Sequence, residues 1–353
     1  MKSIRDVDIA GLRVLMRCDF NVPLDETGKV SDDFRIRAAL PTIEYVLKKK
    51  GKLVLMTHVG DPEGKATQRL RVDGIGEKLA ELLDVPVVKA PDCVGKSVDA
   101  LVSKMAPGEI LLLENLRFHK EEQENGKLFA RQLASLGDIY VNDAFPVCHR
   151  VHASVVGVSK ILPSFAGFFL EHELEELERL IKSPKHPVVA IIGGAKPESK
   201  LSVIDAISKT ADAVLLGNLL GNAAKSRKIK FKNPSKIFFP LDASPGKGKE
   251  FDIGPKTREL FLRKIKGSKT VFWAGPLGKY EEAPYGEGSL AVAKAITMSN
   301  AFSVAGGGNL IAFLGKYRLR EKFSHLSTGG SAMLAFIAGK KLPGLQALHY
   351  YGN

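Results

Sequence analysis

Short apolar runs of strand length recur along the chain, with longer amphipathic segments between them. The runs are LRVLMRCDF, KLVLMTHVG, EILLLENLRF, DIYVNDAF, PVVAIIGGAK, AVLLGN, KIFFPLD, TVFWAGP and FSVAGGG. Several end in Gly, Asp, Asn or His, as strands that lead into functional loops often do. Strand and helix signals that alternate in this way predict an α/β fold with parallel sheets flanked by helices.

This alternation breaks once, at residues 168–187. The stretch FFLEHELEELERLIKSPKHP begins as a charged helical segment and ends in two prolines, which predicts a helix that joins two domains. We therefore expect a first domain at 1–167, an interdomain helix and linker at 168–186, a second domain at 187–330, and a C-terminal segment at 331–353 that returns to the first domain. Ligands of such folds bind beyond the carboxyl ends of the strands, so we expect the strand-end loops to line an interdomain cleft.

The composition is that of a globular protein long enough for two domains. The chain has 353 residues, of which 44% are apolar and 26% charged. It contains no run of about 18 apolar residues, and its N-terminal stretch lacks the apolar core of a signal peptide. The cysteines, Cys18, Cys93 and Cys148, have no metal-ligand spacing and do not suit a disulfide framework. We expect a soluble, cytoplasmic, monomeric protein with reduced thiols.

Basic residues exceed acidic ones, 52 to 39, which gives a formal net charge of +13. Such an excess favours anionic partners, among them nucleic acid, membrane lipid and phosphorylated metabolites. The basic residues are dispersed, and their one local concentration, at 225–236, lacks the interleaved aromatic residues of single-strand binders. A solvated basic loop is the better interpretation of that stretch, so we do not expect nucleic acid or a membrane to be the partner.

Arginine and histidine residues gather at the predicted strand ends of the first domain. Arginine binds carboxylate and phosphate with paired hydrogen bonds, and a ring of Arg and His with an Asp–Asn pair suits a small anion that carries hydroxyl groups. A single histidine at a strand end is more often structural, so the clustering carries the argument. The candidate residues are Asp19, Asn21, His58, Arg117, His149, Arg150 and His152, with Arg35 just before a predicted helix.

Glycine-rich turns follow the predicted strands of the second domain. In IIGGAKPESK two glycines precede Lys196 and Lys200, and a helix that opens there would present amides and both lysines to a polyphosphate. A plain tight turn explains this motif equally well. Glu281, in GPLGKYEE, either reaches a ribose or faces water, and HLSTGGSAML places possible helix caps before Gly329 and Gly330. No turn matches the P-loop pattern, and no dinucleotide-binding motif follows a strand.

Taken in order, the motifs resemble those of the phosphoglycerate kinase family over nearly the whole chain. They are CDFNVPL, RIRAALPTI, LLLENLRFHKEE, YVNDAF followed by HRVHAS, IIGGAK, DIGPKT, GPLG and HLSTGG. The resemblance implies two α/β domains with a hinge, and reversible phosphoryl transfer between 1,3-bisphosphoglycerate and ADP that gives 3-phosphoglycerate and ATP with magnesium.

The resemblance also assigns residues to the two substrates. It implies that the acid substrate binds Asp19, Asn21, Arg35, His58, Arg117 and Arg150. It implies that the nucleotide binds Gly194, Lys196, Lys200, Gly217, Glu281, Gly307, Gly308 and Asn309. Phosphoryl transfer requires mainly positioning and charge stabilisation, which Arg35, Lys200 and the amides near Gly329 and Gly330 would supply.

The chain departs from the family pattern mostly on the nucleotide side. Asn309 stands where the family has the aspartate expected to hold magnesium, and Leu310 replaces the hydroxyl residue beside it. Ser199 replaces another aspartate, and the segment between LLGN and DIGPKT is shorter than in the family. On the acid side Asp61 replaces an arginine, which exchanges a cation for an anion. The departures on the nucleotide side also fit a non-catalytic relative that keeps an anion site and acts as a binding or regulatory protein.

Overall fold

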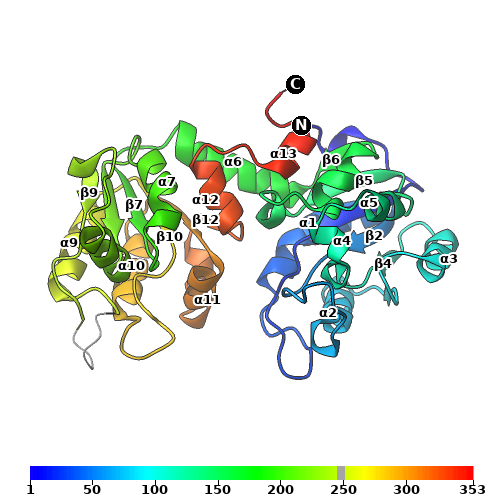
Figure 1. The fold of residues 1–353 in the computed structure, drawn as a ribbon, viewed down its shortest axis with the longest axis horizontal. Coiled ribbons are helices and arrows are strands. Elements are labelled where there is room, and N and C mark those ends of the chain that lie inside the picture. Colours follow the sequence, from blue (N-terminus) through cyan, green and yellow to red (C-terminus); the bar gives the residue numbers. More distant parts are fainter. Residues whose placement is uncertain (245–250, 353) are drawn as a thin grey trace. The chain divides into compact units, whose positions relative to one another are not determined.

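The computed structural model describes residues 1–244 and 251–352. The chain forms two compact units, Met1–His172 together with Lys341–Asn353, and Glu173–Lys340. Each unit holds one parallel sheet with helices packed on it, as Figure 1 shows. The expected α/β fold with two parallel sheets is thereby confirmed.

Among the described residues, the first unit forms a six-stranded sheet in the order β3-β4-β2-β1-β5-β6. The strands are β1 (Arg13–Cys18), β2 (Lys52–Met56), β3 (Val87–Lys89), β4 (Ile110–Leu112), β5 (Ile139–Asp143) and β6 (Ser164–Ala166). The helices are α1 (Phe34–Lys48), α2 (Asp73–Leu83), α3 (Lys96–Lys104), α4 (Lys120–Gln123), α5 (Lys127–Ala134) and α13 (Pro343–Ala347). Shorter helical turns are η1 (Ile4–Asp6), η2 (Gln68–Leu70), η3 (Leu116–Phe118), η4 (Phe145–Val147), η5 (Ala153–Gly157) and η6 (Val158–Lys160).

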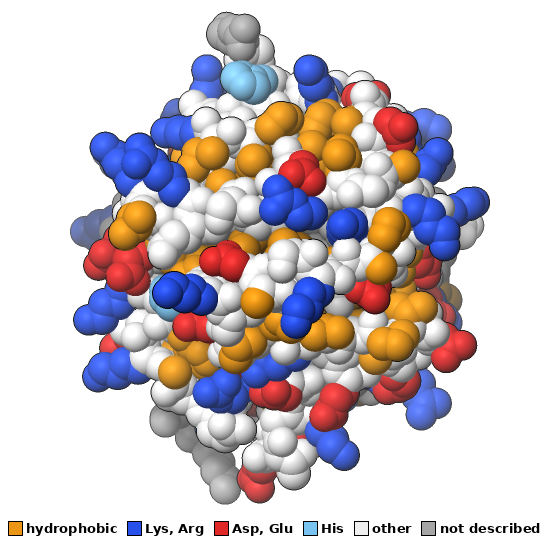
Figure 2. Space-filling view, turned by 90° about the vertical axis from the view of Figure 1, so that its right-hand side faces the viewer, with side chains coloured by type: hydrophobic (Ala, Val, Ile, Leu, Met, Phe, Trp, Pro, Cys, Tyr) orange, Lys and Arg blue, Asp and Glu red, His pale blue; other side chains and the backbone are white. Residues whose placement is uncertain are grey.

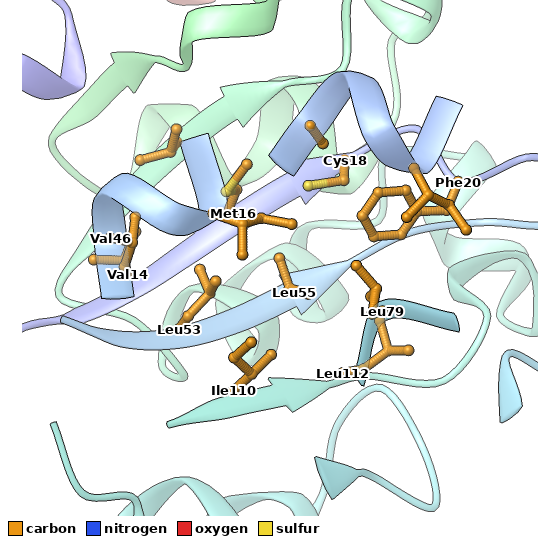
Figure 3. Packing of buried hydrophobic residues seen from close by; sticks show 14 of the residues in the cluster. Val14, Met16, Cys18, Phe20, Val46, Leu53, Leu55, Leu79, Ile110 and Leu112 are labelled. Atoms are coloured by element: carbon orange, nitrogen blue, oxygen red, sulfur yellow. The ribbon is translucent and has the colours of Figure 1, made fainter. Parts of the chain in front are cut away.

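One hydrophobic cluster of this unit lies on the sheet face that α1 and α2 cover, and a second lies on the opposite face, under α3 and α5. The apolar residues of α1 that point into the first cluster, Ile36, Ala39, Ile43 and Val46, recur at helical spacing, which is why the segment folds as an amphipathic helix. Figure 3 shows the side chains of β1, β2 and β4 packed against these helices. The Cys18 thiol lies within this apolar packing and has no disulfide partner.

In the second unit, the described part of the chain also forms a six-stranded sheet, in the order β12-β11-β10-β7-β8-β9. Its strands are β7 (Val188–Ile192), β8 (Ala213–Leu216), β9 (Ile237–Phe238), β10 (Thr270–Ala274), β11 (Phe302–Gly306) and β12 (His325–Ser327). Its helices are α7 (Glu198–Ile207), α8 (Asn218–Ser226), α9 (Pro255–Lys266), α10 (Glu287–Met298), α11 (Gly308–Lys316) and α12 (Ser331–Ile337), with the short turns η7 (Pro234–Lys236) and η8 (Arg320–Lys322).

The helix expected at 168–187 is α6 (Phe168–Lys182), which begins in the first unit and ends in the second. Its last turn carries Arg179 and Lys182, where cations favour the helix dipole. The C-terminal segment from Lys341 belongs to the first unit, where the Gly344 amide donates a hydrogen bond to the Cys148 carbonyl (2.9 Å).

The apolar pattern missed three strands, β3, β6 and β12. Each has only three residues, and β3 is partly exposed along its whole length, so none produces a long apolar run. They were found only through their backbone pairing with β4, β5 and β11. None of the helices in residues 1–244 and 251–352 has the length and apolar character to cross a membrane.

Candidate active site

The first group of predicted residues lies at the carboxyl ends of β1 and β2. Asp19 directly follows β1, and its Oδ2 accepts a hydrogen bond from Arg35 Nη1. Arg35 lies inside the first turn of α1, which corrects the expectation that it precedes the helix. His58, two residues beyond β2, places its Nδ1 3.9 Å from Asp19 Oδ1. The parallel register of the two strands therefore brings these side chains together.

Arg117 joins this group from η3, beyond β4. Its Nη1 donates a hydrogen bond to the Gly60 carbonyl (2.7 Å), and the Gly60 amide donates to Asn21 Oδ1 (2.9 Å). Partial burial lowers the pKa of Arg117, the Asp61 carboxylate opposes this shift, and the charges of Arg17 and Arg150 add to it. Positive charge is thus concentrated here, which favours an anion as ligand.

Asp61, the acidic departure, lies beside this group. Its Oδ1 accepts a hydrogen bond from Gln123 Nε2 (2.9 Å) and lies 3.7 Å from Arg117 Nη1. Its side chain remains 65% exposed. The carboxylate therefore competes with an incoming anion for Arg117.

The remaining predicted residues of the first unit are His149, Arg150 and His152. Burial, followed by the charges of Arg17, Arg117 and Arg150, lowers the pKa of His152 to about 3. Burial also lowers the pKa of His149 and, strongly, that of His58. These imidazoles are neutral at pH 7, so they offer hydrogen bonds, while the arginines supply the positive charge.

Several buried polar atoms of this cluster have no hydrogen-bond partner in the described chain. They are Asp19 Oδ1, Arg117 Nε, His149 Nδ1 and His152 Nδ1. Buried polar atoms are nearly always paired in folded proteins, and unpaired ones raise the question of a missing ligand or water. Four such atoms on residues that the sequence singled out make this cluster the candidate ligand site of the first unit.

A buried network behind the histidines was not predicted. Arg17, which is fully buried in β1, places Nη2 3.0 Å from His58 Nδ1 and donates from Nε to Ser154 Oγ (3.0 Å). Ser154 in turn donates from Oγ and N to the buried carboxylate of Glu122 (2.6 and 2.9 Å). The only signal in the sequence was an arginine inside an apolar strand run.

In the second unit the glycine turns at the ends of four strands are hydrogen-bonded to one another. The amides of Gly193, Gly217 and Gly275 donate to Ala274, Ile192 and Gly306 carbonyls (2.8, 2.8 and 3.3 Å). A Cβ at Gly193 would lie 2.0 Å from the Pro276 carbonyl oxygen, and one at Gly217 would lie 3.2 Å from that of Leu277. Only glycine at position 193 permits this approach, which keeps the backbone at the strand ends close together.

Lys200 and Lys196 lie at the start of α7. Burial lowers the pKa of Lys200, and no ion pair is recorded for its ammonium group within the described residues. A Cβ at Gly194, whose φ is +119°, would lie 3.7 Å from Lys200 Cε, so the lysine stem runs along the glycine turn. Lys196 is exposed, and its carbonyl accepts a hydrogen bond from Ser199 Oγ (2.8 Å). An unpaired, half-buried ammonium beside a glycine turn suits a phosphate group.

The two departures at α11 have different surroundings. Gly307 caps the helix with φ 108°, Gly308 begins it, and Asn309 is exposed on its first turn. Leu310 is fully buried in the hydrophobic core of the unit. Leu310 is therefore a packing residue, and only Asn309 changes the chemistry of the exposed turn.

The turn at Gly329 and Gly330 is held by a residue that the sequence did not indicate. Glu173, fully buried on α6, accepts a hydrogen bond from the Thr328 amide (2.9 Å) and lies 3.0 Å from His325 Nε2. The expected capping of α12 by Ser327 or Thr328 is wrong, since the cap residue is Gly330, with φ +47°.

Asn309 and Ser199 bear on whether these turns could hold magnesium. Magnesium prefers carboxylate oxygens, whereas Asn309 and Ser199 offer only neutral oxygens. Within the described chain, no hydrogen bond joins Glu281 to the glycine turns; its neighbours Lys279 and Glu282 form an ion pair with each other.

Comparison with known proteins agrees with this geometry. The sequence profile described as phosphoglycerate kinase matches residues 4–231 and 222–340. A phosphoglycerate kinase of Pelotomaculum thermopropionicum is 39% identical over 98% of this chain and 98% of the relative. One of Anaeromyxobacter dehalogenans is 41% identical over 98% of this chain and 99% of the relative.

Solved structures agree as well. The crystal structure of phosphoglycerate kinase from Pyrococcus horikoshii matches with a TM-score of 0.88 and 31% identity, over 99% of this chain and 98% of that chain. These similarities favour an enzyme over the non-catalytic relative that the departures left open. The chain therefore belongs to the phosphoglycerate kinase family and is a phosphotransferase.

Proposed function

We propose that the two units divide the substrates of phosphoglycerate kinase between them. The region 1–167 binds 3-phosphoglycerate or 1,3-bisphosphoglycerate, and the region 187–330 binds ATP or ADP. The observation that carries the first assignment is the set of buried, unpaired polar atoms on Asp19, Arg117, His149 and His152. A small acid with phosphate and hydroxyl groups offers acceptors and donors for such atoms.

On the acid side, charge and hydrogen bonding are divided between two kinds of residue. Arg35, Arg117 and Arg150 bind the phosphate and carboxylate oxygens. The neutral imidazoles of His58, His149 and His152, together with Asp19 and Asn21, bind the hydroxyl group and fix its orientation. Depressed histidine pKa values keep the imidazoles neutral near pH 7 before the ligand binds.

On the nucleotide side, the backbone carries most of the recognition. The amides at Gly194, Gly217, Gly307 and Gly308, with Lys196 and Lys200, bind the phosphates, and Asn309 adds a neutral hydrogen-bonding group. Glu281 binds the ribose in this assignment. Lys200 is the residue best suited to bind a phosphate, because it is partly buried beside Gly194 and solvent screens its charge less there.

The proposed chemistry needs no covalent intermediate and no general base. Phosphoryl transfer requires in-line positioning and stabilisation of charge on the transferred group. Arg35 supplies that charge on the acid side, and Lys200 with the amides of Gly329 and Gly330 supplies it on the nucleotide side. Ser199 and Asn309 would offer magnesium only neutral oxygens, so the nucleotide phosphates would have to supply its anionic ligands.

A nucleic-acid function has less support. On the face drawn in Figure 2, Lys and Arg side chains are interspersed with Asp and Glu. Phosphate-backbone binding calls for a continuous basic stripe.

The proposed function is tested by coupled turnover of 3-phosphoglycerate, ATP and magnesium. Lys200→Ala should lower kcat by about 100-fold or more, as loss of a group that stabilises transition-state charge does. Lys294→Ala, an exposed lysine on α10, is the matched control and should leave the rate unchanged. Absence of turnover in the unmodified chain, with no ADP binding by calorimetry, would sink the proposal.

Asn309→Asp separates loss of metal binding from loss of the site. If the unmodified chain turns over, the variant should need less magnesium for half-maximal rate, because a carboxylate adds charge at the turn. If only the variant turns over, the natural chain has lost its nucleotide function at this one position.

A further inference from the structure

Asp92, Cys93 and His119 form a cluster of potential metal ligands on the first unit, among residues that the acid site does not use. Asp92 and Cys93 lie in the turn between β3 and α3, and His119 lies between η3 and α4. One ligand atom from each, a carboxylate oxygen, the thiol sulfur and an imidazole nitrogen, lie within 4.8 Å of one another. The sequence did not predict this grouping, because His119 is far from Cys93 along the chain.

We propose that these three side chains bind a divalent cation of the zinc class. Nitrogen, sulfur and oxygen ligands bind zinc at about 2.0–2.3 Å in tetrahedral geometry, so neighbouring ligand atoms lie about 3.3–3.8 Å apart, inside the 4.8 Å that encloses this group. His119 Nε2 and Asp92 Oδ1, now 2.6 Å apart, would separate by about 1 Å to admit the cation. Thiolate and imidazole together favour zinc or cobalt over magnesium and calcium. Three protein ligands leave a fourth position for water.

The ligand atoms are already held near one another. His119 Nε2 lies 2.6 Å from Asp92 Oδ1, and the Cys93 amide donates to the same oxygen (2.6 Å). The His119 ring stacks on Phe129, with centroids 4.9 Å apart and planes at 27°. Packing of this kind limits ring rotation, so little side-chain entropy is lost when a cation binds.

The cluster is open on one side and closed on the other. Cys93 is fully buried, whereas the side chains of His119 and Asp92 are 25% and 50% exposed. Cys93 Sγ lies 3.0 Å from the Glu114 carbonyl oxygen, which holds the thiol in place. A cation can therefore enter from solvent and meet the sulfur at the closed end, with water at the open position.

Binding exchanges protons for the cation. The Cys93 S–H bond breaks, the sulfur–metal bond forms, and the thiol proton leaves to solvent. His119 would bind the cation through Nε2 with a proton on Nδ1, and a proton displaced from between Nε2 and Asp92 Oδ1 would move to Nδ1 or leave to solvent. No electron is transferred. Without a cation, the same geometry is an ordinary Asp–His hydrogen bond, which the following titration distinguishes from a metal site.

The test is a cobalt titration of the full chain, freed of metal with a chelator and kept without nucleotide. Co²⁺ bound to a thiolate gives a sulfur-to-metal charge-transfer band in the near ultraviolet, and tetrahedral coordination gives strong visible bands. We expect both to saturate at one equivalent and to be displaced by Zn²⁺. Cys93→Ala should abolish the charge-transfer band, whereas Cys18→Ala, which removes another buried thiol, should keep it.

Variants at the other ligands keep the test independent of any damage to the core at Cys93. His119→Gln and Asp92→Asn should each weaken cobalt binding by more than about 10-fold. Loss of a residue that only supports a ligand already lowers metal affinity by about 10-fold or more, and loss of a ligand itself should cost more. Absence of a charge-transfer band in the unmodified chain overturns the proposal. So does a band of unchanged intensity and affinity in Cys93→Ala or in His119→Gln.

Discussion

At the scale of single residues, position 61 alters the acid site most directly. Asp61 lies between Gln123 and Arg117, and its charge opposes that of the phosphate proposed to bind there. The exposure of its side chain means that solvent screens part of this effect. A moderate loss of affinity is expected from such a carboxylate.

Asp61→Arg should therefore tighten binding of 3-phosphoglycerate by about 1.5- to 5-fold, the range for an exposed charge interaction. Isothermal titration with 3-phosphoglycerate alone measures it. Glu26→Arg, an exposed site in the same unit, makes the same change in net charge and serves as control. Equal tightening in both variants would assign the effect to net charge.

Ser154 is a second residue whose role depends on its neighbours. It links the buried charges of Arg17 and Glu122 through hydrogen bonds of 3.0 and 2.6 Å. Arg17 in turn contacts His58. Ser154 is a positioning residue, because it acts on the site through Arg17.

Ser154→Ala should lower the free energy of unfolding by about 2–4 kcal/mol, since two buried charged groups lose a partner. It should also raise KM for the acid more than it changes kcat, because Arg17 then holds His58 less firmly. Urea unfolding and initial rates measure the two effects. Ser103→Ala, on the exposed face of α3, should change neither. A loss below about 1 kcal/mol would contradict the role of Ser154.

At the scale of elements, the glycine turns show how local sequence sets a strand-to-helix junction. Gly307 caps α11 with φ +108°, and a Cβ there would meet no atom closer than 4.0 Å. Gly308 begins the helix, has no atom within 4 Å of an added Cβ and carries no positive φ. The two neighbours differ in backbone conformation, while both have space for a methyl group.

Gly307→Ala should therefore destabilise the protein by about 1–2 kcal/mol through backbone strain. Gly308→Ala should stabilise it by about 0.4–1 kcal/mol, because alanine reduces the entropy of the unfolded chain. Thermal or urea unfolding of the pair measures the contrast. Similar destabilisation by both would show that space at the turn, rather than φ, decides the effect.

At the scale of the whole molecule, buried ionisable groups shape the dependence of stability on pH. Burial raises the pKa of Asp143 to about 7, although hydrogen bonds from Thr42 and the Leu170 and Phe169 amides oppose the rise and Glu171 adds to it. The folded state then holds a proton that the unfolded state releases above about pH 4. Asp143 therefore contributes stability at low pH that is lost as pH rises towards 7. Histidines of lowered pKa, such as His152, act in the opposite direction below about pH 6.5.

Asp143→Asn should accordingly gain stability relative to the unmodified chain between pH 4 and pH 8, by at most about 4 kcal/mol. Urea unfolding at several pH values measures the difference. Asp138→Asn is the matched control, because pairing with Arg13 lowers the pKa of Asp138. Asp138→Asn should lower the free energy of unfolding at neutral pH, and this loss should disappear as pH falls below the lowered pKa of Asp138. A change in unfolding free energy of the same sign in both variants at neutral pH would contradict this account.

The sequence by itself determined the fold class and predicted that Asp19, Arg35 and His58 lie near one another. Apolar runs that alternate with helical segments are enough to predict parallel sheets. A strand of such a sheet is buried on both faces, so nearly all of its residues are apolar. Parallel strands bring their carboxyl ends to one edge, so Asp19 and His58 were predictable as neighbours without knowing the packing.

The tertiary structure alone decided which partners lie behind those residues. Arg17 and Ser154 are 137 positions apart, and Cys93 and His119 lie close together because the turns after β3 and η3 are neighbours in the fold. Leu310, which in sequence resembles a loss at the phosphate turn, is a core residue. Local periodicity specifies which face of an element is apolar, whereas contacts between distant residues depend on the register and packing of whole elements. The packing of whole elements therefore determines which residues lie behind the proposed 3-phosphoglycerate site and which residues form the proposed cation site.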